Sequence, residues 1–121
     1  MTPMPPEVMR TLAAYRTIIT KVQTVLWRQG GRISTLDGLQ LALIPDGLTN
    51  VSQMRREGYL VTTSPTATVK RLKAEGCIVQ NDGGGDARKH LFELTPKGIE
   101  LAEAIRKALG GEDVVRMEAA E

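Results

Sequence analysis

Charged side chains that could bind a polyanion follow a run of three glycines. The segment reads DGGGDARK, residues 82–89, and places Asp86 two positions before Arg88, with Lys89 next. Glycines beside a cation suit either a phosphate-binding loop or a basic loop that enters a nucleic-acid groove. A P-loop has a Gly-Lys-Ser/Thr sequence and leads into a helix, whereas this segment leads into the strand-like run KHLFEL. The pattern therefore favours the groove-binding loop.

Each charged residue of this loop has a chemical role under that interpretation. Arg88 suits a narrow, electronegative minor groove, because its guanidinium is long and permanently charged. Asp86 can hold that guanidinium in place, and Lys89 would add a phosphate contact. The glycines would let the turn adopt left-handed backbone angles. The alternative is a solvated hairpin with one surface ion pair, which contributes under about 1 kcal/mol.

A second group of candidate contacts lies on residues 63–76, where the pair Ser64-Pro65 is a typical helix start. We expect the Ser64 hydroxyl to cap this helix. Small and hydroxyl side chains that permit close approach to base edges come first: Thr63, Ser64, Thr66 and Ala67. Cations suited to guanine or phosphate oxygens follow: Lys70, Arg71 and Lys73. A solvated surface helix would carry similar residues, so this helix favours DNA only in combination with the loop.

The segment before this helix supplies weaker candidates. Arg55 and Arg56 lie near the end of the run NVSQMRRE, which we expect to be a helix capped by Thr49 or Asn50. Their side chains would reach backbone phosphates.

The composition argues against several other kinds of site. Aromatic residues make up 3% of the chain, too few for a base-stacking platform. Cys77 and His90 are each the only residue of their type, so an internal disulfide and a His/Cys metal site are both excluded. No nucleophile–base pair or carboxylate pair is recognisable, and we expect neither an enzyme nor a cofactor. Cys77 is expected to be a small buried hydrophobe rather than a redox sensor.

The length of 121 residues indicates one domain, residues 1–121. The net charge is only +2, but cations predominate in residues 1–34 and 54–97, and acidic residues predominate after residue 98. One face of the molecule could therefore contact nucleic acid.

No stretch is long enough to span a bilayer, and the N-terminus lacks the apolar core of a signal peptide. We therefore expect a cytoplasmic protein with no membrane partner.

Apolar periodicity predicts a long first helix over residues 6–30. Its seam has steps of four and three residues: Val8, Leu12, Tyr15, Ile19, Val22 and Leu26. This seam could pack entirely on the chain's own core, but it is longer than a small core requires. We therefore predict that it mediates a homodimer. Trp27 is expected to anchor the helix.

The remaining elements give a mainly α fold with a small β-hairpin (α+β). A short helix at TLDGLQLALI, capped by Ser34 or Thr35, precedes a helix-turn-helix at 49–76. A hairpin with strands at CIVQ and KHLFEL forms a wing over residues 77–95, and a helix and tail occupy 96–121. Two short helices that lead into a two-stranded ribbon match the winged helix-turn-helix plan, in which the second helix enters the DNA major groove.

At these residues the chain resembles the MarR (multiple antibiotic resistance regulator) family. The segment LKAEGCI, residues 72–78, is similar to that family's "LekkGlI" after the recognition helix. Asp86-Ala87-Arg88, and then LTPKG at 94–98, are similar to its D-x-R wing and its "LTxxG" helix start. The connection GYLVTTS, residues 58–64, is longer than the family's usual turn.

The resemblance implies a dimer held by the terminal helices, an Asp86 that braces Arg88, and a DNA-binding regulator, most often a repressor. It leaves the existence and identity of a small-molecule effector open. The alternative function is a winged-helix module that binds protein in a replication or secretion assembly.

Overall fold

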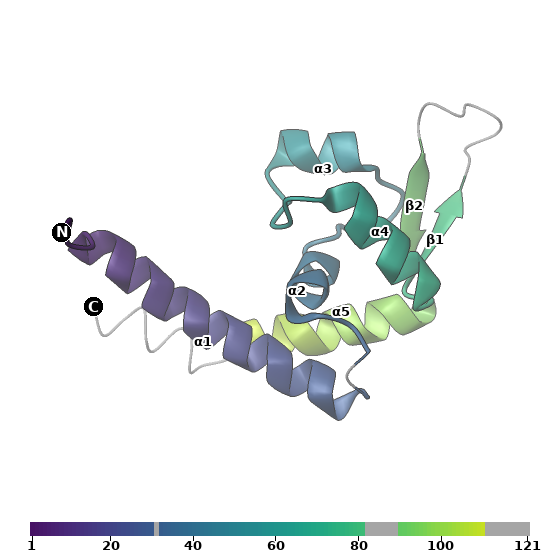
Figure 1. Ribbon diagram of the computed structural model, residues 1–121. Helices are drawn as coiled ribbons and strands as arrows, with labels where there is room; N and C mark the ends of the chain where they lie inside the picture. The colour runs from purple at the N-terminus through teal and green to yellow at the C-terminus, as the bar shows by residue number, and fades with distance from the viewer. Residues whose placement is uncertain (31, 82–89, 111–121) are drawn as a thin grey trace.

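The computed structural model describes residues 1–30, 32–81 and 90–110. Within them the chain forms five helices and a two-stranded antiparallel sheet (Figure 1). The elements follow one another as α1 (Pro6–Arg28), α2 (Thr35–Ala42), α3 (Val51–Glu57), α4 (Pro65–Ala74), β1 (Ile78–Asn81), β2 (Leu91–Leu94) and α5 (Pro96–Leu109). The expected mainly α fold with a small hairpin is confirmed.

Side-chain caps fix where three of the helices begin. The Ser34 hydroxyl accepts from the Asp37 amide (3.3 Å) at the start of α2. Asn50 Oδ1 accepts from the Gln53 amide (2.8 Å) before α3, so Asn50 rather than Thr49 is the cap. Thr95 Oγ1 does the same for α5. Such caps satisfy amides that have no partner within the helix.

The start of α4 differs from the expectation. Ser64 precedes the helix, but its side chain makes no capping hydrogen bond. Pro65 occupies the first turn, where its fixed φ and missing N–H are tolerated. The backbone of Ser64 has ψ 69°, well away from the extended value of the Ser34 and Asn50 caps.

The first hairpin strand begins one residue later than the expected 77–80, and the second begins at Leu91 within the expected 89–94. Cys77 is not part of the strand because its amide donates to the Leu72 carbonyl (2.9 Å) and so closes the end of α4. Gly76, with φ 76°, supplies the left-handed residue that this helix end requires. In the sheet Ile78 pairs with Leu94 and Asn81 with Leu91, and Thr49 adds an isolated antiparallel bridge to Phe92.

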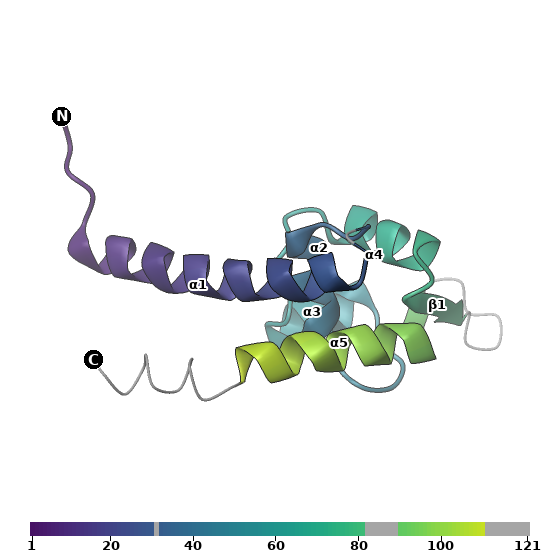
Figure 2. The same ribbon diagram turned by 90° about the horizontal axis from the view of Figure 1, so that it is seen from below.

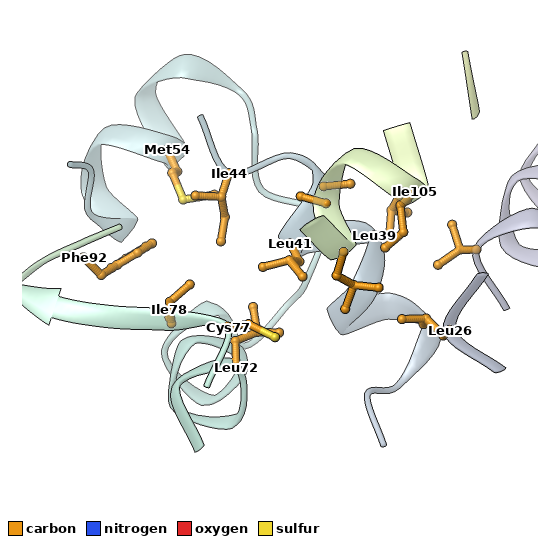
Figure 3. Packing of buried hydrophobic residues seen from close by; sticks show 14 residues of the cluster. Leu26, Leu39, Leu41, Ile44, Met54, Leu72, Cys77, Ile78, Phe92 and Ile105 are labelled. Atoms are coloured by element: carbon orange, nitrogen blue, oxygen red, sulfur yellow. The ribbon is translucent and has the colours of Figure 1, made fainter. Parts of the chain in front are cut away.

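The apolar core lies where α2 is surrounded by the other elements. Leu41 and Ile44 from the α2 segment, Leu72 from α4, and Ile105 from α5 are almost completely buried, and Figure 3 shows them pointing toward one another. Cys77 is also fully buried, as expected. Arg106 of α5 fixes the end of α2, since its guanidinium donates to the carbonyls of Ala42 and Ile44 (both 2.8 Å).

The long helix α1 packs on the core only through its second half. Val22 and Leu26 are buried there, and α5 lies beside this half and runs in the opposite direction (Figure 2). The first half extends beyond the other described elements (Figures 1 and 2). Trp27 is 81% exposed, so the expectation that it anchors the helix is wrong: it lies on the side of α1 that faces away from the core.

Candidate nucleic-acid interface

One end of the molecule carries α3, α4 and the hairpin, and the opposite end carries α1 and α5 (Figure 1). Between α3, α4 and the hairpin the surface forms an open groove of about 590 Å³. Side chains of Arg56, Lys70 and Lys73 line it together with His90, and its apolar lining includes Val69. Three permanent cations around one groove form a surface that suits a polyanion.

Residues on α4 and just before it lie largely as the sequence indicates. Thr63, Ser64, Thr66, Lys70 and Lys73 are exposed, and Ala67 is half-buried. The opposite side of α4 is in the core. Leu72 is fully buried, while the other fully buried residue is Thr68 rather than Val69, which is only half-buried.

Lys73 connects α4 to the hairpin. Its Nζ donates to Gln80 Oε1 on β1 (3.0 Å). Both residues line the groove, so this hydrogen bond links the helix to the first strand on an exposed part of the surface. On α3, Arg55 and Arg56 are both exposed, and Arg56 is the one that lines the groove.

Arg71 is exposed on α4, as the sequence predicts, and it also makes an ion pair with α2. Its Nε donates to Asp37 Oδ2 (2.6 Å), and its Nη2 donates to Asp37 Oδ1 (3.0 Å) and to Thr68 Oγ1 (3.2 Å). The Asp37 side chain is 5% exposed and the Arg71 side chain 57%. The guanidinium is thus held against α2, while more than half of the Arg71 side chain remains exposed.

This ion pair shifts the pKa of both partners. The hydrogen bond from Arg71 holds the pKa of Asp37 below its ordinary value, although burial alone would raise it. The same hydrogen bond raises the pKa of Arg71. Asp37 is therefore ionised in the folded protein at neutral pH.

Sequence reasoning missed Gln40, which holds the connection between α3 and α4. Its Nε2 donates to the Tyr59 carbonyl (2.9 Å), and its Oε1 accepts from the amides of Val61 (2.8 Å) and Thr62 (3.4 Å). Gln40 is 3% exposed and Asp37 4% exposed. The sequence did contain a signal for this role, because Asp37 and Gln40 are two polar residues three positions apart within the apolar run of α2.

The base of the hairpin is attached to the start of α5. Thr95 Oγ1 donates to the Gly76 carbonyl (2.6 Å), and Lys97 Nζ donates to the Glu75 carbonyl (2.7 Å). A Cβ at Gly98 would overlap the Cys77 carbonyl oxygen, so α5 begins in direct contact with the end of α4. These contacts fix the direction in which β1 leaves α4.

The predicted tip of the wing lies outside the described residues. This includes Asp86, Arg88 and Lys89, so their predicted roles remain predictions.

Within the described part of the chain, no three His, Cys, Asp or Glu residues are grouped so as to hold a metal ion. No described helix is both long and apolar enough to cross a membrane.

Burial raises the pKa of the Cys77 thiol, which keeps the thiol protonated at neutral pH.

The predicted dimer seam divides into two parts. Val22 and Leu26 are taken up by the chain's own core, so the prediction that all six seam residues serve a partner is too broad. Ile19 is half-buried against the same core. Val8, Leu12 and Tyr15 are 39%, 52% and 43% exposed and form an apolar stripe on the part of α1 that extends outward.

Solved structures share this arrangement over nearly the whole chain. The reduced form of MarR from E. coli superposes with a TM-score of 0.70 at 15% identity, covering 93% of this chain and 81% of that one. The chain has the MarR-type winged-helix fold. The transcriptional regulator BldR from Sulfolobus solfataricus superposes with a TM-score of 0.63 at 22% identity, covering 95% of this chain and 81% of that one.

The similarity to these structures lies in the fold. No protein-family profile matches the chain, and no curated protein matches it in sequence. In the terms of the MarR-type fold, α3 and α4 are the helix-turn-helix, the β1–β2 hairpin is the wing, and α1 and α5 are the terminal helices.

Proposed function

We propose that this protein is a sequence-specific double-stranded DNA-binding transcriptional regulator that acts as a homodimeric repressor in the cytoplasm. The observation that carries the proposal is the groove between α3, α4 and the hairpin, with Arg56, Lys70 and Lys73 around it. The transcriptional regulator BldR, which shares the fold, supports the same class of function.

In the proposed complex α4 lies in the major groove. Its exposed N-terminal end is formed by small and hydroxyl side chains that allow close approach to base edges and thymine methyl groups: Thr63, Ser64, Thr66 and the half-buried Ala67. Lys70 and Lys73 contact guanine or phosphate oxygens, and Arg55 and Arg56 contact the phosphate backbone. The wing residue Arg88, braced by Asp86, enters the neighbouring minor groove, and Lys89 contacts a phosphate.

Dimerisation uses the exposed stripe Val8, Leu12 and Tyr15 on α1. Exposed apolar side chains at helical spacing are costly to leave in water and are typical of helix–helix association. A homodimer would read two half-sites about one duplex turn apart. Occupation of both grooves at such a site excludes other proteins from it, which is how a repressor acts.

Selection from random duplexes with the purified protein tests this function. The expected result is enrichment of a palindrome whose half-site centres are separated by about 10 base pairs or a multiple of that. Enrichment of single, unpaired half-sites would contradict the dimer. No enrichment at all would contradict sequence-specific binding.

A further inference from the structure

Helix α2 buries two polar side chains on one face. Asp37 and Gln40 are three positions apart and are 4% and 3% exposed, although most of their neighbours on α2 are apolar. Burial of a carboxylate is costly unless it is paired, and an apolar side chain at either position would pack against the core without that cost. The hydrogen bonds that Asp37 and Gln40 make should therefore explain why polar side chains occupy these positions.

Within the described residues, the hydrogen bonds that these two side chains make to other elements lead to α4 and to the segment that precedes it. Asp37 binds Arg71 in the middle of α4 through two hydrogen bonds of 2.6 and 3.0 Å. Gln40 binds the backbone of the connection at Tyr59, Val61 and Thr62. Asp37 thus restrains rotation of α4 about its axis, and Gln40 restrains the chain segment that leads into the N-terminus of α4.

The apolar contacts of α4 do not fix its rotation to the same degree. Leu72 is the one fully buried apolar side chain among the described residues of α4; Val69 is only half-buried, and the other fully buried residue, Thr68, is polar and accepts from Arg71. Directional hydrogen bonds to charged groups are stronger and more specific in geometry than contacts between apolar side chains. Helix α2 is itself held to α5 by Arg106, so it is a fixed reference for the placement of α4.

We propose that Asp37 and Gln40 are positioning residues that set the orientation of α4 for base recognition, and that Arg71 acts through Asp37 and not by contact with DNA. This inference rests on the proposed DNA-binding function. It predicts that the two α2 residues, which lie away from the cationic groove, determine how well Thr66 and Lys70 are presented to base edges.

The first test is the effect of Asp37→Asn on DNA affinity. If Asp37 merely diverted Arg71 from DNA, the variant would free a cation, remove a negative charge and bind more tightly. If Asp37 positions α4, the variant binds the selected duplex about tenfold more weakly, a change of about 1.4 kcal/mol, while its affinity for an unrelated duplex changes little.

Asp46→Asn is the matched control, because it makes the same change of charge at a carboxylate that is 92% exposed. Asp46→Asn should leave unchanged the ratio of the affinity for the selected duplex to the affinity for an unrelated duplex. Gln40→Met, which keeps the volume and removes the hydrogen bonds, should lower that ratio as Asp37→Asn does. Arg71→Ala combined with Asp37→Ala should lose no more than either single change, since both act through one contact.

Amide hydrogen exchange tests the positioning without DNA. In Asp37→Asn and Gln40→Met, exchange should accelerate in α4 and in residues 59–62, while α5 remains protected. Equal acceleration in α5 would mean a general loss of stability and would overturn the inference, as would tighter specific binding by Asp37→Asn. A wild-type protein that bound no duplex would contradict the proposed function, and the exchange result would still decide the positioning.

Discussion

Gly98 shows how one residue controls the relation between the wing and the last helix. It is buried at the start of α5, where any Cβ would overlap the backbone carbonyl of Cys77. Gly38 is also tightly packed, but a Cβ there would meet the end of the Leu26 side chain at 2.7 Å. Backbone cannot yield as a flexible side chain can, so the two glycines are not equivalent.

Gly98→Ala should therefore lower the free energy of unfolding by about 3 kcal/mol. Gly38→Ala should cost less than about 1 kcal/mol, since Leu26 can change rotamer and alanine favours the helix by a similar amount. Urea unfolding of both variants measures the two changes. Equal losses would show that the contact between Gly98 and Cys77 does not restrict the fold.

Asp37 gives a prediction about pH. Its pKa in the folded protein is held below the ordinary 3.8 by the Arg71 hydrogen bond, so folding favours the ionised form. The resulting stabilisation is complete at pH values well above 3.8 and is lost as the pH falls through the lowered pKa.

The difference in free energy of unfolding between wild type and Asp37→Asn should be constant between about pH 5 and pH 7 and should shrink below about pH 4. Thermal or urea unfolding across this range measures it. Titration of other carboxylates affects both proteins and cancels in the difference. A difference that stayed constant down to about pH 2 would contradict the stabilising ion pair.

At the scale of elements, local sequence signals predicted the helices well. Ser34 and Asn50, each one of two predicted candidates, cap their helices, since a cap depends on residues within one turn, whereas the predicted Ser64 cap does not form. Where the prediction failed, the deciding contact was more distant or involved the backbone. The Cys77 amide closes α4 instead of entering the strand.

The candidate site was predictable only in part, for the same reason. Lys70 and Lys73 are exposed because helical periodicity fixes the outer face of α4. Arg71 lies on that helix too, but its partner Asp37 is 34 positions away, and no local pattern links them. Gln40 likewise acts on a connection about 20 residues later.

The wing supplies the prediction at this scale. Arg88→Ala should weaken binding by about tenfold on duplexes with A·T-rich flanks, in keeping with about 1–3 kcal/mol for one good groove contact, and less on G·C-rich flanks, whose minor groove is wider. Equilibrium binding to the two kinds of duplex measures the effect. Lys107→Ala on α5 removes the same charge far from the groove and should change neither affinity.

At the scale of the whole molecule, the two ends of the chain have different surfaces. The end with α3, α4 and the hairpin presents cations around a groove, and the outer half of α1 presents an apolar stripe. Helix α2 lies between them and contacts α1, α4 and α5. This division places the proposed DNA contacts and the proposed dimer contacts on separate parts of one fold.

Leu12→Glu should convert the homodimer to a monomer, because it places a charge in the centre of the apolar stripe. Light scattering after size-exclusion chromatography measures the mass. Ala14→Glu introduces the same charge on another exposed side of α1 and should leave the dimer intact. A monomeric wild type, or a dimer that survives Leu12→Glu, would contradict the assignment of this stripe.

The most direct test of DNA binding by the α4 face is the salt dependence of affinity for the selected duplex. For a dimer with about six phosphate contacts, log K should fall with log salt at a slope of about −5, and Lys70→Ala should make the slope shallower by about 2, one contact in each protomer. A shallow slope that is the same in wild type and variant, as expected of a protein-binding module, would contradict the account.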